Sequence, residues 1–181
     1  MTSLRTFVVY VEDKPGVLNR VSSLFRRRAF NIKSLSVGET DQAGVSRMTI
    51  VMDGADAVAR LVEANLYKLV NVLRVEDVTH RAAVHRDLAL VKVRAEASAR
   101  AQVLQVAEVF RARVIDVGTE ALILEITGTE DKIDGLVDVL RPFGIVEMAR
   151  TGTVAMARGP DAPSINPEFV HAEVPELPFG G

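Results

Sequence analysis

Hydrophobic and polar positions follow two periods along this chain, and the two periods recur in a fixed order. Residues 4–11 are apolar on both faces of a strand, because Phe7 and its alternate neighbours point one way while Val8 points the other. Residues 17–28 instead place apolar side chains at helical spacing, with polar side chains opposite. The first pattern predicts a strand that is covered on both faces, and the second predicts an amphipathic helix.

The patterns that follow complete one domain. Alternating residues 31–37 and 46–52 predict a hairpin around a short polar turn. A second helix is expected to begin near the cap Asp53, and a closing strand to span residues 70–78. The order βαββαβ is the ferredoxin-like plan. We therefore assign residues 1–79 to a first domain of this kind.

The same order then starts again. Residues 80–87 are polar and are interpreted as a linker. They are followed by a strand, a helix capped by Ser98, a hairpin, a helix capped by Thr129 and a last strand. Residues 88–158 are thus predicted to form a second ferredoxin-like domain, which makes the fold class α+β. Residues 159–181 are rich in proline and lack a periodic segment, so they are expected to be extended or disordered.

Composition narrows the classes of function. The net charge of -2 and the pI near 6.0 offer no general attraction to nucleic acid. The basic triplet at residues 26–28 closes a predicted helix and is interpreted as a solvated helix end. Cysteine is absent, which removes disulfides and thiolate chemistry and fits a reducing compartment. No apolar run reaches the ~20 residues of a membrane span, and no secretory signal opens the chain, so we expect a cytoplasmic protein without membrane contact.

Candidate catalytic groups are sparse. The three histidines fall in the linker and the tail, and no phosphate loop, metal-ligand spacing or nucleophile motif occurs. Asp53 and Asp56 are interpreted as helix caps rather than as paired acids. The sequence therefore argues against catalysis and against a cofactor or metal in this chain, and favours binding and communication.

One junction stands out as a candidate binding site. Residues 12–18 join the first strand to the first helix, and Gly16 can adopt a positive φ and exposes its backbone to a ligand. The N–H groups of Gly16, Val17 and Leu18 are expected to be unpaired donors at the positive end of the helix dipole, which suits a carboxylate. The alternative is an ordinary strand-to-helix turn. The second half has no glycine at the matching place, so the first half is the candidate.

Four motifs lie along the first half: residues 11–18 (VEDKPGVL), 28–35 (RAFNIKSL), 46–50 (SRMTI) and 68–72 (KLVNV). Together they resemble the ACT domain of the small, regulatory subunit of acetolactate synthase (acetohydroxyacid synthase). The second half is similar to the C-terminal domain of that family at residues 88–93 (LALVKV), 110–117 (FRARVIDV) and 157–159 (ARG). The resemblance covers about residues 4–159.

This resemblance implies a subunit without activity of its own. It would stimulate a large catalytic subunit that depends on thiamine diphosphate, FAD and Mg²⁺, and it would confer feedback inhibition by valine on the synthesis of valine, leucine and isoleucine. In the family, two ACT domains pair into a homodimer and valine binds in the seam. The implied ligand-binding residues are Asp13, Gly16, Val17 and Leu18 of one chain with Asn31 and Ile32 of the other. Some relatives have Asn at the position of Asp13, and a carboxylate there would prefer the ligand's ammonium group.

The pairing has a physical basis in the predicted sheet. In a βαββαβ sheet the second strand, residues 32–39, is an edge with unpaired backbone groups, and two such edges can join across a two-fold axis. Two other hypotheses remain: a stand-alone sensor with repeated ACT domains that regulates a different enzyme, and a small ferredoxin-like enzyme. A pull-down of a large thiamine-diphosphate enzyme would separate the first two, and turnover by the purified chain would support the third.

Overall fold

The computed structural model describes residues 3–160 and residue 165. The chain divides into two units. Of the described residues, the first unit contains those up to Ala83 and those from Ala155, and the second unit is Val84–Val154.

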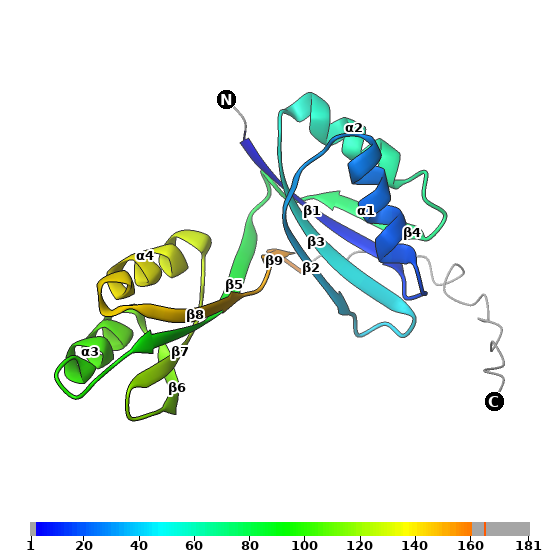
Figure 1. Ribbon diagram of the computed structural model, residues 1–181. Helices are drawn as coiled ribbons and strands as arrows, with labels where there is room; N and C mark the ends of the chain where they lie inside the picture. The colour runs from blue at the N-terminus through cyan, green and yellow to red at the C-terminus, as the bar shows by residue number, and fades with distance from the viewer. Residues whose placement is uncertain (1–2, 161–164, 166–181) are drawn as a thin grey trace, which may run out of the picture. The chain divides into compact units, whose positions relative to one another are not determined.

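The first unit has the predicted βαββαβ order (Figure 1). Its elements are β1 (Ser3–Glu12), α1 (Val17–Arg27), β2 (Ile32–Glu39), β3 (Val45–Gly54), α2 (Asp56–Leu66) and β4 (Val72–Asp77). The strands are antiparallel in the order β2-β3-β1-β4. β2 is therefore an edge strand, as its place in the predicted plan required.

One face of this sheet packs against both helices. Phe7 and Val9 of β1 and Ile50 of β3 are fully buried there, against apolar side chains of α1 and α2. Phe25 near the end of α1 meets Phe30 edge to face, with ring centroids 6.1 Å apart. These contacts use the apolar stripe that the helical periodicity predicted, so the inward face of each helix is decided by its sequence.

The opposite face of the first sheet is also covered, as the two-sided apolar pattern of residues 4–11 predicted. Val8 is 1% exposed and Tyr10 is 8% exposed. Their cover includes Val78 and the fully buried Ala155, with Ile165 packed against the same cluster. Ala155 belongs to β9 (Val154–Ala157), a strand that the sequence analysis did not predict. The first unit is thus completed by residues that follow the second.

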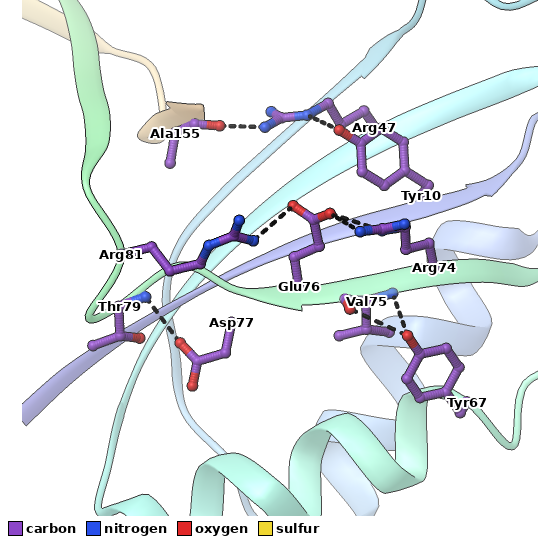
Figure 2. Close-up of polar contacts among 10 residues, drawn as sticks. All are labelled: Tyr10, Arg47, Tyr67, Arg74, Val75, Glu76, Asp77, Thr79, Arg81 and Ala155. Atoms are coloured by element: carbon purple, nitrogen blue, oxygen red, sulfur yellow. Dashed lines mark hydrogen bonds and ion pairs between the residues drawn. The ribbon is translucent and has the colours of Figure 1, made fainter. Parts of the chain in front are cut away.

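Polar contacts hold β9 in this position (Figure 2). The Arg47 guanidinium donates to the Ala155 carbonyl and to the Tyr10 hydroxyl, the latter at 3.3 Å. The Ala155 N–H reaches the Thr49 hydroxyl at 3.5 Å. The Arg158 N–H donates to the carbonyl of Ala82 at 2.8 Å, beside the start of the strand that β9 pairs with.

The second unit repeats the order of the first. Its elements are β5 (Ala83–Arg94), α3 (Arg100–Phe110), β6 (Arg113–Val117), β7 (Ala121–Gly128), α4 (Glu130–Leu140), the short 3-10 helix η1 (Arg141–Phe143) and β8 (Ile145–Arg150). The sheet order is β6-β7-β5-β8, and β9 also pairs with β5. The two units together confirm the predicted α+β class with two ferredoxin-like domains.

A half-buried cation connects three elements of the second unit. Arg150 of β8 donates to Asp87 of β5 at 2.8 and 3.0 Å and to Asp134 of α4 at 2.7 Å. Burial by itself would lower the pKa of Arg150, but the hydrogen bonds and the charges of Asp87 and Asp134 raise it. The guanidinium therefore stays charged and links one helix to two strands.

Several boundaries differ from the sequence-based ones. The expected linker, residues 80–87, contains the start of β5 at Ala83. The expected second domain, residues 88–158, loses its last residues to the first unit, because β9 packs there. Most of the expected tail, residues 159–181, lies outside the described residues, which include only Gly159, Pro160 and Ile165 of it.

The helix starts also shift. Asp53 is a β3 residue, and Ala55 takes the N-cap place of α2. Ala99, not Ser98, precedes α3. Thr129 does stand at the N-cap of α4, but its side chain makes no capping hydrogen bond. Among the described residues, no helix has the length and apolar character needed to cross a membrane.

Candidate functional site

The loop that joins β1 to α1 is attached to the β2–β3 hairpin. The Asp13 N–H donates to the carbonyl of Gly44 at 2.8 Å. The Ser46 hydroxyl donates to the Asp13 carboxylate at 3.1 Å. Asp13 is nevertheless exposed, so its second oxygen is open to a further donor.

Gly16 has the conformation that the Pro-Gly pair predicted. Its φ is 81° and its ψ is -3°, the left-handed region, and it stands at the N-cap of α1. No heavy atom of the described chain lies within 4 Å of where a Cβ would stand. A ligand can therefore approach the backbone here. Because Leu18 lies in the first turn, its N–H has no acceptor within the helix.

Val17 differs from the expectation for this loop. Its N–H donates to the Lys14 carbonyl at 3.3 Å, so it is not an unpaired donor. Its side chain is 4% exposed and belongs to the helix-side core. Leu18, in contrast, is 42% exposed beside the loop. The structure thus gives Val17 a packing role and leaves Leu18 as the apolar side chain that a ligand could touch.

A buried polar network supports the loop, and it was not predicted from the sequence. The Glu12 carboxylate accepts from Asn71 and from the Lys14 ammonium, the latter at 3.1 Å. The Glu12 N–H donates to the Asn71 carbonyl at 2.9 Å, and Arg20 of α1 donates to the Asn71 side chain. Glu12 and Asn71 are 9% and 8% exposed. The signal in the sequence was a charged residue directly after the apolar pattern of residues 4–11 and an asparagine inside the expected strand of residues 70–78.

Asn31 and Ile32 lie at the other end of α1. Asn31 is exposed just before β2, and Ile32 is half-buried against the helix-side core. α1 has 11 residues, so it separates them from the loop by roughly 16 Å at 1.5 Å per residue. One chain alone therefore does not bring the six predicted site residues together. They form two groups: residues 13–18 and residues 31–32.

The strand register shows where each group lies along the sheet. Glu12 pairs with Val45, and Glu39 pairs with Ser46, so the β1–α1 loop and the last residue of β2 share one end. Ile32 pairs with Met52 at the opposite end. β2 has no further neighbour in the sheet order β2-β3-β1-β4. The two groups thus lie near opposite ends of an edge strand.

Metal-binding clusters do not add a second candidate. Within residues 3–160 and 165, no three His, Asp or Glu side chains gather in a group that could hold a metal ion. The loop of residues 13–18 remains the place where backbone donors, a carboxylate and an apolar side chain face open space together.

Comparisons with known proteins identify the family of both units. Residues 7–74 match the family described as the AHAS small subunit-like ACT domain, and residues 86–159 match that described as the small subunit of acetolactate synthase. The chain is 50% identical over 159 residues to an acetolactate synthase small subunit of Mycolicibacterium smegmatis, covering 88% of this chain and 94% of that protein. It is 47% identical over 154 residues to a probable acetolactate synthase small subunit of Archaeoglobus fulgidus, covering 85% and 96%.

A solved structure agrees with these sequence matches. The crystal structure of the acetolactate synthase small subunit from Thermotoga maritima superimposes with a TM-score of 0.82 at 38% identity, over 88% of this chain and 99% of that one. The matched regions contain the β1–α1 loop as well as the second unit. The chain therefore belongs to the acetolactate synthase small-subunit family, as a regulatory subunit whose first domain is an ACT domain.

Proposed function

We propose that this subunit forms a homodimer through β2, binds valine in the seam and thereby regulates the catalytic subunit of acetolactate synthase. Valine would act as the feedback inhibitor of branched-chain amino acid synthesis. The binding site would combine Asp13, Gly16 and Leu18 of one chain with Asn31 and Ile32 of the other, while the Val17 side chain holds the loop in the core.

The observation that carries this proposal is the register of the edge strand. If two copies of β2 pair antiparallel about a two-fold axis, the Ile32 end of one lies beside the Glu39 end of the other. That Glu39 end is where the loop of residues 13–18 lies, because Glu12 and Glu39 pair with neighbouring residues of β3. Such a pairing would bring the partner's Asn31 and Ile32 to the loop. It would also satisfy the edge hydrogen bonds of both strands.

A zwitterionic amino acid suits the groups that would meet there. Its carboxylate can accept from first-turn N–H groups at the positive end of α1. Its ammonium can donate to the free oxygen of Asp13, whose other oxygen accepts from Ser46. Its apolar side chain would lie against Leu18 and Ile32. Asn31 would supply an amide to either charged group.

Regulation then requires a catalytic partner. Thiamine diphosphate, Mg²⁺ and FAD would be held by the large subunit, and the residues of this chain would bind and position rather than react. A ligand in the seam can shift activity only if it binds one conformation of the complex better than another. We infer that valine changes how the two chains of the dimer are held, and that the second unit provides much of the contact with the large subunit.

Calorimetry on the purified chain tests the site. Valine, leucine, isoleucine and an unrelated amino acid are titrated into the full chain, and sedimentation measures its association state. We expect a dimer at tens of micromolar and saturable heats for the branched amino acids alone. Valine and leucine should differ by a few-fold, since one methylene contributes ~0.8 kcal/mol. A monomer under these conditions, or equal heats for all four amino acids, would contradict the seam.

Reconstitution with the catalytic subunit tests the regulatory role. The chain by itself should make no acetolactate from pyruvate with any cofactor added. With the large subunit it should raise the rate, and valine should lower that rate again. Acetolactate formed by this chain alone, or a mixture indifferent to valine, would refute the proposal.

A further inference from the structure

A pocket lies in the first unit between the last turns of α1 and the residues at and just after the end of α2. The pocket has a volume of about 480 Å³. Its lining consists of Leu24, Arg27, Arg28, Asn65, Lys68 and Leu69. It is thus large enough for a small molecule, and every lining residue comes from the helix ends of one chain.

The charge of this pocket is one-sided. Arg27, Arg28 and Lys68 line it, and none of the lining residues is acidic. None of these three cations takes part in an ion pair with any residue in the described part of the chain. The pocket therefore concentrates positive charge that the described protein does not neutralise.

Cations at helix C-termini can serve simply as partners of the last carbonyl groups. Here backbone donors already occupy those carbonyls. The Arg28 N–H donates to Leu24 at 3.2 Å, and the Lys68 N–H donates to Asn65 at 3.2 Å. The Leu66 carbonyl accepts from the Leu69 N–H at 3.0 Å. The side-chain donors of the three cations are therefore not required to cap these helices.

A buried amide fixes one of the cations at the pocket. Asn65 is 4% exposed and donates to the Leu61 carbonyl at 2.6 Å. Its side-chain oxygen accepts from Arg28 at 3.1 Å. This contact uses one nitrogen of the guanidinium and leaves its other donors for a ligand. The side chains of Leu24 and Leu69 add an apolar part to a lining that is otherwise strongly basic.

We propose that this pocket binds a small phosphate-bearing anion. Two guanidinium groups can bind phosphate oxygens with paired donors, and the lysine adds a mobile point charge. The lining of the pocket shares no residue with the proposed valine site, and all of it comes from one chain. The two sites are nevertheless near neighbours in the sequence, because Arg28 stands three residues before Asn31.

Titration with pyrophosphate tests this proposal, with the full-length chain in a low-salt buffer. We expect saturable binding of one pyrophosphate per chain, weaker binding of inorganic phosphate, and loss of affinity as salt is added. Arg27→Gln and Lys68→Gln should each lower the affinity at least about tenfold, because each removes a charge-assisted hydrogen bond. Arg26→Gln is the matched control, because Arg26 is exposed at the same helix end but does not line the pocket. It should change the affinity by less than about twofold.

Three results would overturn the proposal. The first is no saturable pyrophosphate binding up to roughly 10 mM, far weaker than a built site would bind. The second is an equal loss in Arg26→Gln and Lys68→Gln, which would mean diffuse attraction by the helix end. The third is citrate binding as tightly as pyrophosphate, which would remove the preference for phosphate. Thermal melting of each variant checks that the fold is retained, since all three substituted side chains are exposed.

Discussion

The two units share one βαββαβ order but differ at the first strand-to-helix junction. In the first unit the junction ends in Gly16, with a φ of 81° and open space around it. In the second unit the Arg100 side chain occupies this region. Its guanidinium donates to the carbonyls of Ala95, Gly118 and Thr119 at 2.6 to 3.2 Å. One junction offers its backbone to a ligand, and the other is closed by its own side chain.

The comparison shows that a few residues separate an open junction from a closed one. Both junctions are tied to a neighbouring hairpin, by Asp13 in the first unit and by Arg100 in the second. Asp13 makes this connection with a short side chain, which leaves open space at the N-terminus of α1. Arg100 makes it with a long side chain, whose guanidinium donates hydrogen bonds to backbone carbonyls of its own unit. Repeating a fold therefore does not repeat a site.

The sheets differ in a second way. On the first sheet the face opposite the helices is sealed, with Val8 1% exposed under β9. On the second sheet the matching face of β5 carries Leu88, Leu90 and Lys92, which are only half-buried. This difference fits the proposal that the second unit provides much of the surface for the catalytic subunit.

Gly16→Asp should have the largest effect on the first junction. A carboxylate ~4 Å from the ligand carboxylate costs up to ~4 kcal/mol at an effective dielectric near 20, which approaches a thousand-fold in affinity. Valine titration of the variant measures this loss of affinity, and activation of the catalytic subunit should persist.

Gly16→Ala separates the effect of charge from the strain of a positive φ. Ala99→Asp, at the N-cap of α3, is the control in the closed junction and should leave valine affinity unchanged. A folded Gly16→Asp variant with normal valine sensitivity would remove the loop from the site.

Deletion of residues 155–181 should have the second largest effect, which is a loss of free energy of unfolding rather than of valine affinity. It uncovers Val8, Tyr10 and Val45, which are all at most 8% exposed. Exposing about half of each side chain costs about 3 kcal/mol in total. Chemical denaturation measures the loss, and deletion of residues 166–181 is the control that keeps β9. Equal stability of the two deletions would contradict a sealing role for β9.

A fragment that ends at Thr79 lacks the same cover, so tests of the second unit are better made by surface substitutions in the whole chain.

Asn31→Ala should weaken valine binding by about 1.5 to 3 kcal/mol if the amide bonds a charged ligand group. Asn31 is exposed, so its loss leaves no buried group unpaired in the free chain. Calorimetry with valine and a thermal melt are made on the same preparation. An affinity loss matched by an equal loss of stability would mean that Asn31 only supports the turn before β2.

Arg100→Ala should open the second junction without creating a site. Three carbonyls lose a donor, and because water can replace it at this half-buried position, the expected loss is about 1 to 2 kcal/mol of stability. Valine affinity should not change, since no glycine there exposes the backbone. Binding of a second valine per chain would show that the Arg100 side chain alone prevents the second junction from binding a ligand.

Local patterns were sufficient for most of the fold. Period-2 and period-3.6 runs depend on neighbours within one element, so the four long helices and eight of the strands follow from them. β9 was missed because Val154–Ala157 is four residues long and gains its partners from distant parts of the chain. The caps Asp53 and Ser98 were wrong because β3 continues to Gly54 and α3 begins after Ala99. Asp53 belongs to β3 because it pairs with Leu4 of β1, and no local sequence pattern encodes that pairing.

The site divides in the same way. The positive φ of Gly16 follows from its place after proline and before a helix. The Glu12–Asn71 bond joins residues 59 apart, so only the folded sheet reveals it. Val17 was expected to offer an unpaired N–H to the ligand, but this N–H donates to the Lys14 carbonyl, and the Val17 side chain packs in the core. Backbone geometry at a junction can thus be predicted from adjacent residues, whereas the support beneath it cannot.

Glu12→Gln should have the smallest effect, and the first sheet supplies a matched control for it. The side chains of Glu12 and Glu76 are each 11% exposed, and both carboxylates are paired with cations. Figure 2 shows Glu76 between Arg74 and Arg81. Glu76 lies on β4 and pairs with Val8, so it is not next to the loop that follows Glu12. Glutamine keeps the shape of either side chain but weakens its pairing. The cost should be about 1 kcal/mol, because the paired cations are 27% to 51% exposed and remain solvated.

The two variants separate support of the loop from general stability. Both should lose a similar amount of stability in denaturation. Only Glu12→Gln should also lose valine affinity, by roughly five-fold, because Lys14 and Asn71 then hold the loop less firmly and binding must restore its order. If Glu76→Gln weakens valine binding as much, the network beneath the loop is ordinary sheet stabilisation. If neither variant changes valine affinity, the hydrogen bonds of Asp13 to Gly44 and Ser46 are sufficient to hold the loop of residues 13–18 in place.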